Sequence, residues 1–127
     1  MDLEQVRPEE DLTRYILHKN HFSILHKRVK YAAFLPAPNG ETSVFRVSGL
    51  ADIAIWEIGD KEVAGKRETA ILGRADIPAF HVLNSTLKIK PDENPPRHAN
   101  ITGWPKEKSE QKLIAIELAE NAKLYLR

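Results

Sequence analysis

The chain is organised around one stretch, Pro95-Pro96-Arg97-His98-Ala99-Asn100-Ile101-Thr102-Gly103-Trp104-Pro105. This stretch holds three of the eight prolines, one of the two tryptophans and one of the five histidines. Proline fixes φ and lacks a backbone N–H, so we expect neither an ordinary strand nor a helix here. The sequence predicts a rigid loop at residues 95–105, and such a loop is the first place to look for functional side chains.

The clearest helix follows this stretch, over residues 106–123, and Pro105 suits its first turn. One face of this helix is apolar and rich in small residues, which permits close packing against a sheet; it consists of Ile114, Ala115, Leu118, Ala119 and Ala122. Leu113 and Ile116 fall outside that face. We therefore expect the terminal helix either to be covered on a second side or to contact a partner.

The preceding part of the chain predicts a sheet. Residues 29–35 and 42–48 are rich in β-branched and aromatic residues, and Asn39-Gly40 between them predicts an antiparallel hairpin. Arg46 lies on the less apolar face of the second strand.

Weaker signals complete the secondary structure. They indicate a helix at residues 50–58, a turn at 73–78 and a half-buried strand at 86–90. The sum is a single α+β domain over residues 1–127, with a small mixed or mainly antiparallel sheet and helices packed on one face. We expect residues 1–11 to be a poorly ordered lead-in.

Composition excludes several classes of site. The chain has 127 residues, with 19 Lys and Arg against 18 Asp and Glu, so its overall charge favours no polyanionic partner. The absence of cysteine removes disulfides, thiolate metal sites and cysteine nucleophiles. No apolar run resembles a signal peptide or a membrane helix. We expect a soluble cytoplasmic protein without a membrane association and without a cofactor.

His98 is the leading candidate for chemistry, because a histidine titrates near neutral pH and the surrounding loop is stiff. Arg97 beside it would neutralise a phosphate or carboxylate, and Asn100 would hydrogen-bond the ring or a ligand. The alternative is that Arg97 and His98 only hold backbone carbonyls of the loop. Trp104 is expected to fasten the loop to the core.

The other histidines do not predict a metal site. His18, His21 and His26 are spaced by three and five residues, which fits no metal-binding motif, and His81 is isolated. Residues 18–30 contain four cationic side chains and three histidines without a carboxylate. This basic run indicates either a phosphate-tracking surface or a solvated sheet edge guarded by lysines.

Three functional hypotheses follow. The first is a binding or adaptor protein that recognises a protein partner, or a second copy of itself, through residues 95–105 and the terminal helix. Its candidate binding residues are Arg97, His98, Asn100, Trp104, Arg46, Leu113 and Ile116. No metal ligand is assigned.

The alternative is a metal-independent enzyme acting on RNA or a nucleotide phosphate. His98 would be its general acid or base, and Arg97, with Arg46 or Arg74, would stabilise the anion. This hypothesis requires a second histidine across a common cleft. The third hypothesis is nucleic-acid binding through residues 18–30.

Overall fold

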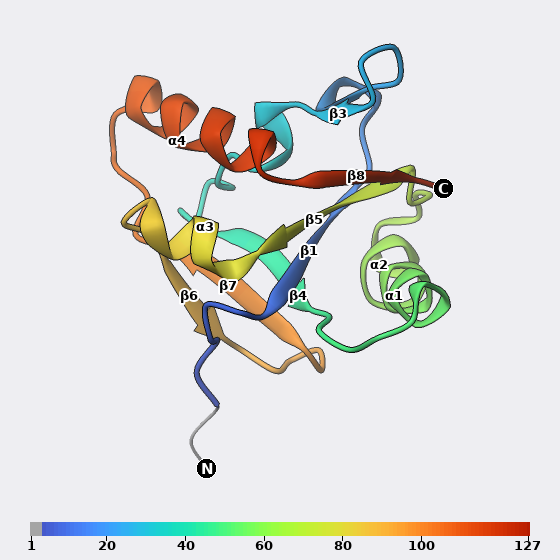
Figure 1. The fold of residues 1–127 in the computed structure, drawn as a ribbon. Helices are drawn as coiled ribbons and strands as arrows, with labels where there is room; N and C mark the ends of the chain where they lie inside the picture. Colours follow the sequence, from blue (N-terminus) through green and yellow to red (C-terminus); the bar gives the residue numbers. More distant parts are fainter. Residues whose placement is uncertain (1–3) are drawn as a thin grey trace.

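The protein is described by a computed structural model over residues 4–127 (Figure 1). Six strands form one antiparallel sheet in the order β6-β7-β4-β1-β5-β8. They are β1 (Asp11–Ile16), β4 (Thr42–Arg46), β5 (Gly73–Pro78), β6 (Lys88–Pro91), β7 (His98–Thr102) and β8 (Lys123–Leu126). A separate hairpin pairs β2 (Phe22–Ser23) with β3 (Arg28–Val29).

The helical elements lie between these strands. They are α1 (Asp52–Gly59), a π-helical turn η3 (Asp60–Ala64), α2 (Gly65–Arg67), α3 (Ala79–Asn84) and α4 (Lys108–Glu120), with short 3-10 turns η1 (Lys19–His21) and η2 (Tyr31–Ala33). The predicted α+β class and the terminal helix are confirmed. Within residues 4–127, no helix combines the length and the apolar character that a membrane span needs.

One face of the sheet carries the larger core. Helices α3 and α4 and the turn η2 cover it, while α1 and α2 lie on the opposite side (Figure 1). Ala115, Leu118 and Ala119 of α4 are buried there, as the pattern of small and apolar residues predicts. Leu12 and Ile16 of β1 point into the same core.

The other face is covered only in part. Helix α1 packs through Ile55 on a smaller apolar cluster that contains Tyr15, Phe45 and Val47. The β6 edge carries exposed Lys88 and Lys90, which the register places opposite Thr102 and Asn100 of β7. The second face is therefore apolar beneath α1 and polar beside it.

The prediction of a rigid loop over residues 95–105 is wrong for its centre. His98–Thr102 forms strand β7, which lies inside the sheet between β4 and β6. The prolines occupy only the ends of the stretch, and Ala99 and Ile101 alternate with more exposed neighbours, which is the pattern of a strand. The prolines therefore delimit this strand and do not replace it.

The predicted hairpin between residues 29–35 and 42–48 is also wrong. Strand β4 pairs with β1 and β7, while Tyr31–Ala33 forms the 3-10 turn η2. The buried Thr42 hydroxyl donates to the Phe34 carbonyl, which holds this turn against the strand without a ladder. The prediction of a turn at residues 73–78 is wrong, because this segment is strand β5. Its polar residues Arg74 and Asp76 are unusual in a buried strand and favoured the interpretation as a turn.

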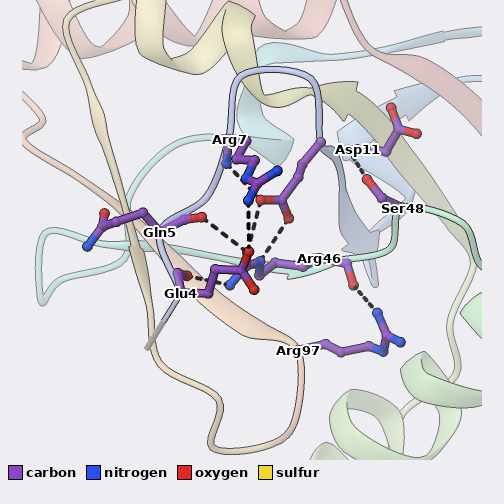
Figure 2. A network of polar contacts seen from close by, with 8 residues as sticks. Glu4, Gln5, Arg7, Asp11, Arg46, Ser48 and Arg97 are labelled. Carbon is purple, nitrogen blue, oxygen red and sulfur yellow. Dashed lines mark hydrogen bonds and ion pairs between the residues drawn. The ribbon is translucent and has the colours of Figure 1, made fainter. Parts of the chain in front are cut away.

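Arg46 ties the segment before β1 to the sheet (Figure 2). Its Nε and Nη2 donate to the two Glu10 carboxylate oxygens, each over 2.9 Å, and its Nη1 donates to the Glu4 carbonyl over 2.8 Å. Burial acts to raise the pKa of Glu10, but hydrogen bonds and charge from Arg46 and Arg7 bring this pKa below its ordinary value of 4.5. The ion pair therefore stabilises the fold while Glu10 is ionised.

We predict that Arg46→Gln lowers the free energy of unfolding by about 1–3 kcal/mol at pH 7. The folded-state pKa of Glu10 is lowered, so this contribution is present above about pH 4.5 and is lost as the pH falls through the folded-state value. Urea denaturation at pH 7 and pH 3 measures both effects. Arg127→Gln, which breaks an exposed ion pair with Asp60, should cost less at pH 7. If Arg46→Gln lowers the free energy of unfolding by the same amount at both pH values, the ion pair with Glu10 is not the cause of the loss.

Candidate functional site

A cavity of about 300 Å³ opens on the second face of the sheet, beside the helical segment formed by η3 and α2. Its sheet side is made by Tyr15, Ser43, Phe45 and His98. Lys66 and Arg67 of α2 face it from the helical side. The cavity thus lies where the apolar part of this face meets the polar part.

The cavity lies beside the point where β1 and β4 no longer pair. Strand β1 pairs with β5 through six residues, from Asp11 to Ile16, but with β4 only through Leu12 and Thr13. Beyond that point the Arg14 side chain joins neighbouring segments. Its Nε donates to the Ala33 carbonyl over 2.9 Å, and its Nη1 donates to the Ser43 carbonyl over 3.0 Å.

Arg14 is a cation without a counter-ion in the described part of the chain. Within residues 4–127 no carboxylate forms an ion pair with it, and its Nη2 makes no hydrogen bond. Burial, and to a lesser degree the charge of Arg67, lowers its pKa to about 10. Arg14 therefore remains charged at neutral pH and lines the cavity with one donor group unused.

The other charged residues around the cavity make it more positive. Lys66 and Arg67 are exposed cations on α2. Glu62, the one carboxylate among the residues that line the cavity, pairs with Lys66 over 3.6 Å. Three cations thus face a single carboxylate, which is the charge balance of an anion site.

Three histidines line the same cavity. His18 and His21 come from the segment around η1, with their ring centroids 4.9 Å apart, and His98 comes from β7. Burial lowers the pKa of His21, and the neighbouring His18 and Arg14 lower it further. The three imidazoles thus come from two distant parts of the sequence.

Both ring nitrogens of His98 are engaged. Its Nε2 lies 2.7 Å from the Ser43 hydroxyl, and its Nδ1 lies 3.0 Å from an Asp92 carboxylate oxygen. The ring stacks edge-on against Phe45 with 5.3 Å between centroids. These contacts fix the orientation of the imidazole at the cavity wall.

Most of the other candidate residues lie elsewhere. Arg97 is exposed with φ at 73°, and it lines a separate hollow beside α1. Arg46 is held by Glu10, and Arg74 is buried between the rings of Trp56 and Tyr125, bound to Asp52 and Asp76. Of the arginines proposed from the sequence to stabilise an anion, none lines the cavity with His98.

The remaining candidates are also dispersed. Trp104 packs on the larger core, and Asn100 lies beside Ser43 in the β4–β7 register. Leu113 is exposed on α4, and Ile116 lines a different groove. The structure therefore brings only His98, out of the predicted binding set, to this cavity.

Sequence reasoning did not single out Arg14 or Ser43. Arg14 alternates with Leu12 and Ile16, which places a guanidinium in line with two fully buried side chains of one strand. A charged residue at a buried position of a strand is unusual and indicates a functional or structural role for Arg14. Ser43 carried no such signal, because its partner His98 lies 55 positions away in sequence.

Among residues 4–127, no group of three histidine, aspartate or glutamate side chains is arranged to hold a metal ion. Comparisons with protein-family models, curated proteins and solved structures found no match.

We predict that protonation of His21 weakens the fold. Because its folded-state pKa lies below the ordinary value of 6.5, the unfolded chain takes up the proton first as the pH falls. The free energy of unfolding should therefore decrease between pH 7.5 and pH 5.5, and His21→Gln should reduce that decrease. Urea denaturation of both proteins at the two pH values measures the effect. An unchanged pH dependence in His21→Gln would contradict the burial assigned to this ring.

Proposed function

We propose that the protein binds a phosphate-bearing ligand in this cavity and acts on its phosphate ester, with His98 as the general acid or base. The observation that carries the proposal is the Arg14 guanidinium, which lines the cavity without a carboxylate partner within residues 4–127. A partly desolvated cation gains most from an anion that supplies both charge and hydrogen-bond acceptors.

Phosphate fits the cavity better than a single carboxylate does. Lys66 and Arg67 add two cations to Arg14, and only one of the three charges is offset, by Glu62. A phosphate dianion offers enough charge and acceptor oxygens to engage more than one of them. About 300 Å³ is at the small end for ligand pockets, which favours a nucleotide-sized molecule or the phosphorylated end of an RNA.

The arrangement supports the enzyme hypothesis drawn from the sequence, with one change of residue. That hypothesis requires a second histidine at a common cleft, and both His18 and His21 line the cavity with His98. The anion-stabilising role passes from Arg97 to Arg14. An intracellular nucleotide or RNA ligand accords with the cytoplasmic location predicted from the cysteine-free sequence.

We predict that Arg14→Gln weakens binding of inorganic phosphate and of a nucleoside 5′-monophosphate by about 10- to 100-fold, because a charge-assisted hydrogen bond is lost. Isothermal titration calorimetry at low salt measures the affinities. Arg7→Gln removes the same charge from an exposed side chain outside the cavity and should leave them unchanged. Equal affinities for wild type and Arg14→Gln would refute the proposal.

A second proposal keeps the terminal helix as an interaction surface for another copy of the chain. Leu113 is 69% exposed on α4, and Ile116 lines a groove between this helix, the start of β8 and residues 27–31, which include β3. Strand β7 lies inside the sheet with both edges paired, whereas Leu113 on the helix is exposed, so the helix is the surface we retain.

We predict that self-association through α4 depends on Leu113. Leu113→Glu places a charge on an exposed apolar position and should shift a dimer towards monomer without altering the fold. Sedimentation velocity across a concentration series measures this shift. A wild-type chain that stays monomeric throughout the series would contradict the proposal.

A further inference from the structure

We propose that Ser43, His98 and Asp92 form a nucleophilic relay in which Ser43 attacks the phosphorus of a phosphate monoester. This inference rests on the proposed binding of a phosphate group and adds the attacking atom. The three side chains form a continuous hydrogen-bonded chain, with 2.7 Å between Ser43 Oγ and His98 Nε2 and 3.0 Å between His98 Nδ1 and Asp92 Oδ2.

The order of the three groups sets the direction of proton movement. An ionised Asp92 carboxylate only accepts hydrogen bonds, so the Nδ1 atom of His98 carries the proton. In the neutral ring Nε2 is then the unprotonated nitrogen, and it accepts the hydrogen bond from the Ser43 hydroxyl. This is the tautomer in which an imidazole removes a proton from a serine.

The fold holds these groups in place by three separate constraints. Strands β4 and β7 pair with Phe45 opposite His98 and Ser43 opposite Asn100, so the serine and the histidine are close on one face. The Asp92 N–H donates to the His98 carbonyl over 2.9 Å, which fixes the residue that orients the ring. The His98 side chain is 13% exposed, and its ring lies against Phe45.

The serine is also placed next to the anion-binding group. Ser43 lines the cavity, and its own carbonyl accepts the hydrogen bond from Arg14 Nη1 over 3.0 Å. A phosphate held by Arg14 therefore lies beside the Ser43 residue. The cation would then stabilise the charge that builds on the phosphoryl oxygens as attack proceeds.

The reaction has two balanced steps. In the first, the Ser43 Oγ–P bond forms and the bond from phosphorus to the ester oxygen breaks, while the Ser43 proton passes to His98 Nε2 and then to the leaving alcohol. In the second, water attacks the phosphoserine and gives its proton to His98. The Oγ–P bond then breaks, His98 returns a proton to Ser43, and inorganic phosphate leaves. Ser43 and His98 are the catalytic residues, and Asp92 is a positioning residue.

An alkyl fluorophosphonate tests the relay without a known substrate. Attack by Ser43 would form the Oγ–P bond, break the P–F bond and release fluoride, with the serine proton accepted by His98. Mass spectrometry of the wild-type protein should then find one adduct, located on the peptide that contains Ser43. Ser43→Ala and His98→Gln should abolish that adduct. Asp92→Asn should slow labelling at least tenfold while phosphate binding stays unchanged, which a merely structural role would not produce.

Two results would overturn the inference: no adduct on the wild-type protein, or an adduct at a site other than Ser43. Circular dichroism and phosphate titration of Ser43→Ala establish that this variant is folded and keeps its binding site. Failure of the two proposals is distinguishable. Phosphate binding through Arg14 without labelling of Ser43 would support the proposed binding site and contradict the relay. Labelling of Ser43 without phosphate binding would support the relay and contradict phosphate as the class of ligand.

Discussion

The site depends on one constraint, the guanidinium of Arg14 at the point where β1 and β4 stop pairing. A partly buried charge is costly unless its hydrogen bonds and its charge are both satisfied. The carbonyls of Ala33 and Ser43 satisfy part of its hydrogen-bonding capacity, while within residues 4–127 no carboxylate neutralises it. Within residues 4–127 the fold thus leaves this cation without a counter-ion, and the other cations of the cavity increase the positive potential around it.

The strand order explains how distant residues meet at this cation. Strand β4 lies between β1 and β7, so Ser43 has Arg14 on one side and His98 on the other. The helical segment after β4 returns over the same face and supplies Lys66 and Arg67. The segment after β1 supplies His18 and His21. The cavity therefore collects charge and proton-transfer groups from four separate parts of the sequence.

Local patterns predicted the parts of the fold that local forces decide. The pattern of small and apolar residues in α4 correctly predicted which face of this helix is buried. His98 was recognised as a candidate because its titratable ring lies in a stretch flanked by prolines. Pairing between distant strands was not predictable in this way. The Asn39-Gly40 signal suggested a local hairpin, yet β4 pairs with β1 and β7, because the buried faces of these strands complete the core. The contact between Ser43 and His98 follows from that non-local pairing and has no local signature.

The most direct test of the account is the position of an anion in a crystal. A crystal structure of the protein grown with tungstate, a heavy analogue of phosphate, locates the anion by its anomalous scattering. We predict one strong peak in the cavity, within hydrogen-bonding distance of Arg14 Nη2 and beside the Ser43 hydroxyl. An empty cavity, with Arg14 paired to a carboxylate of its own chain, would contradict it.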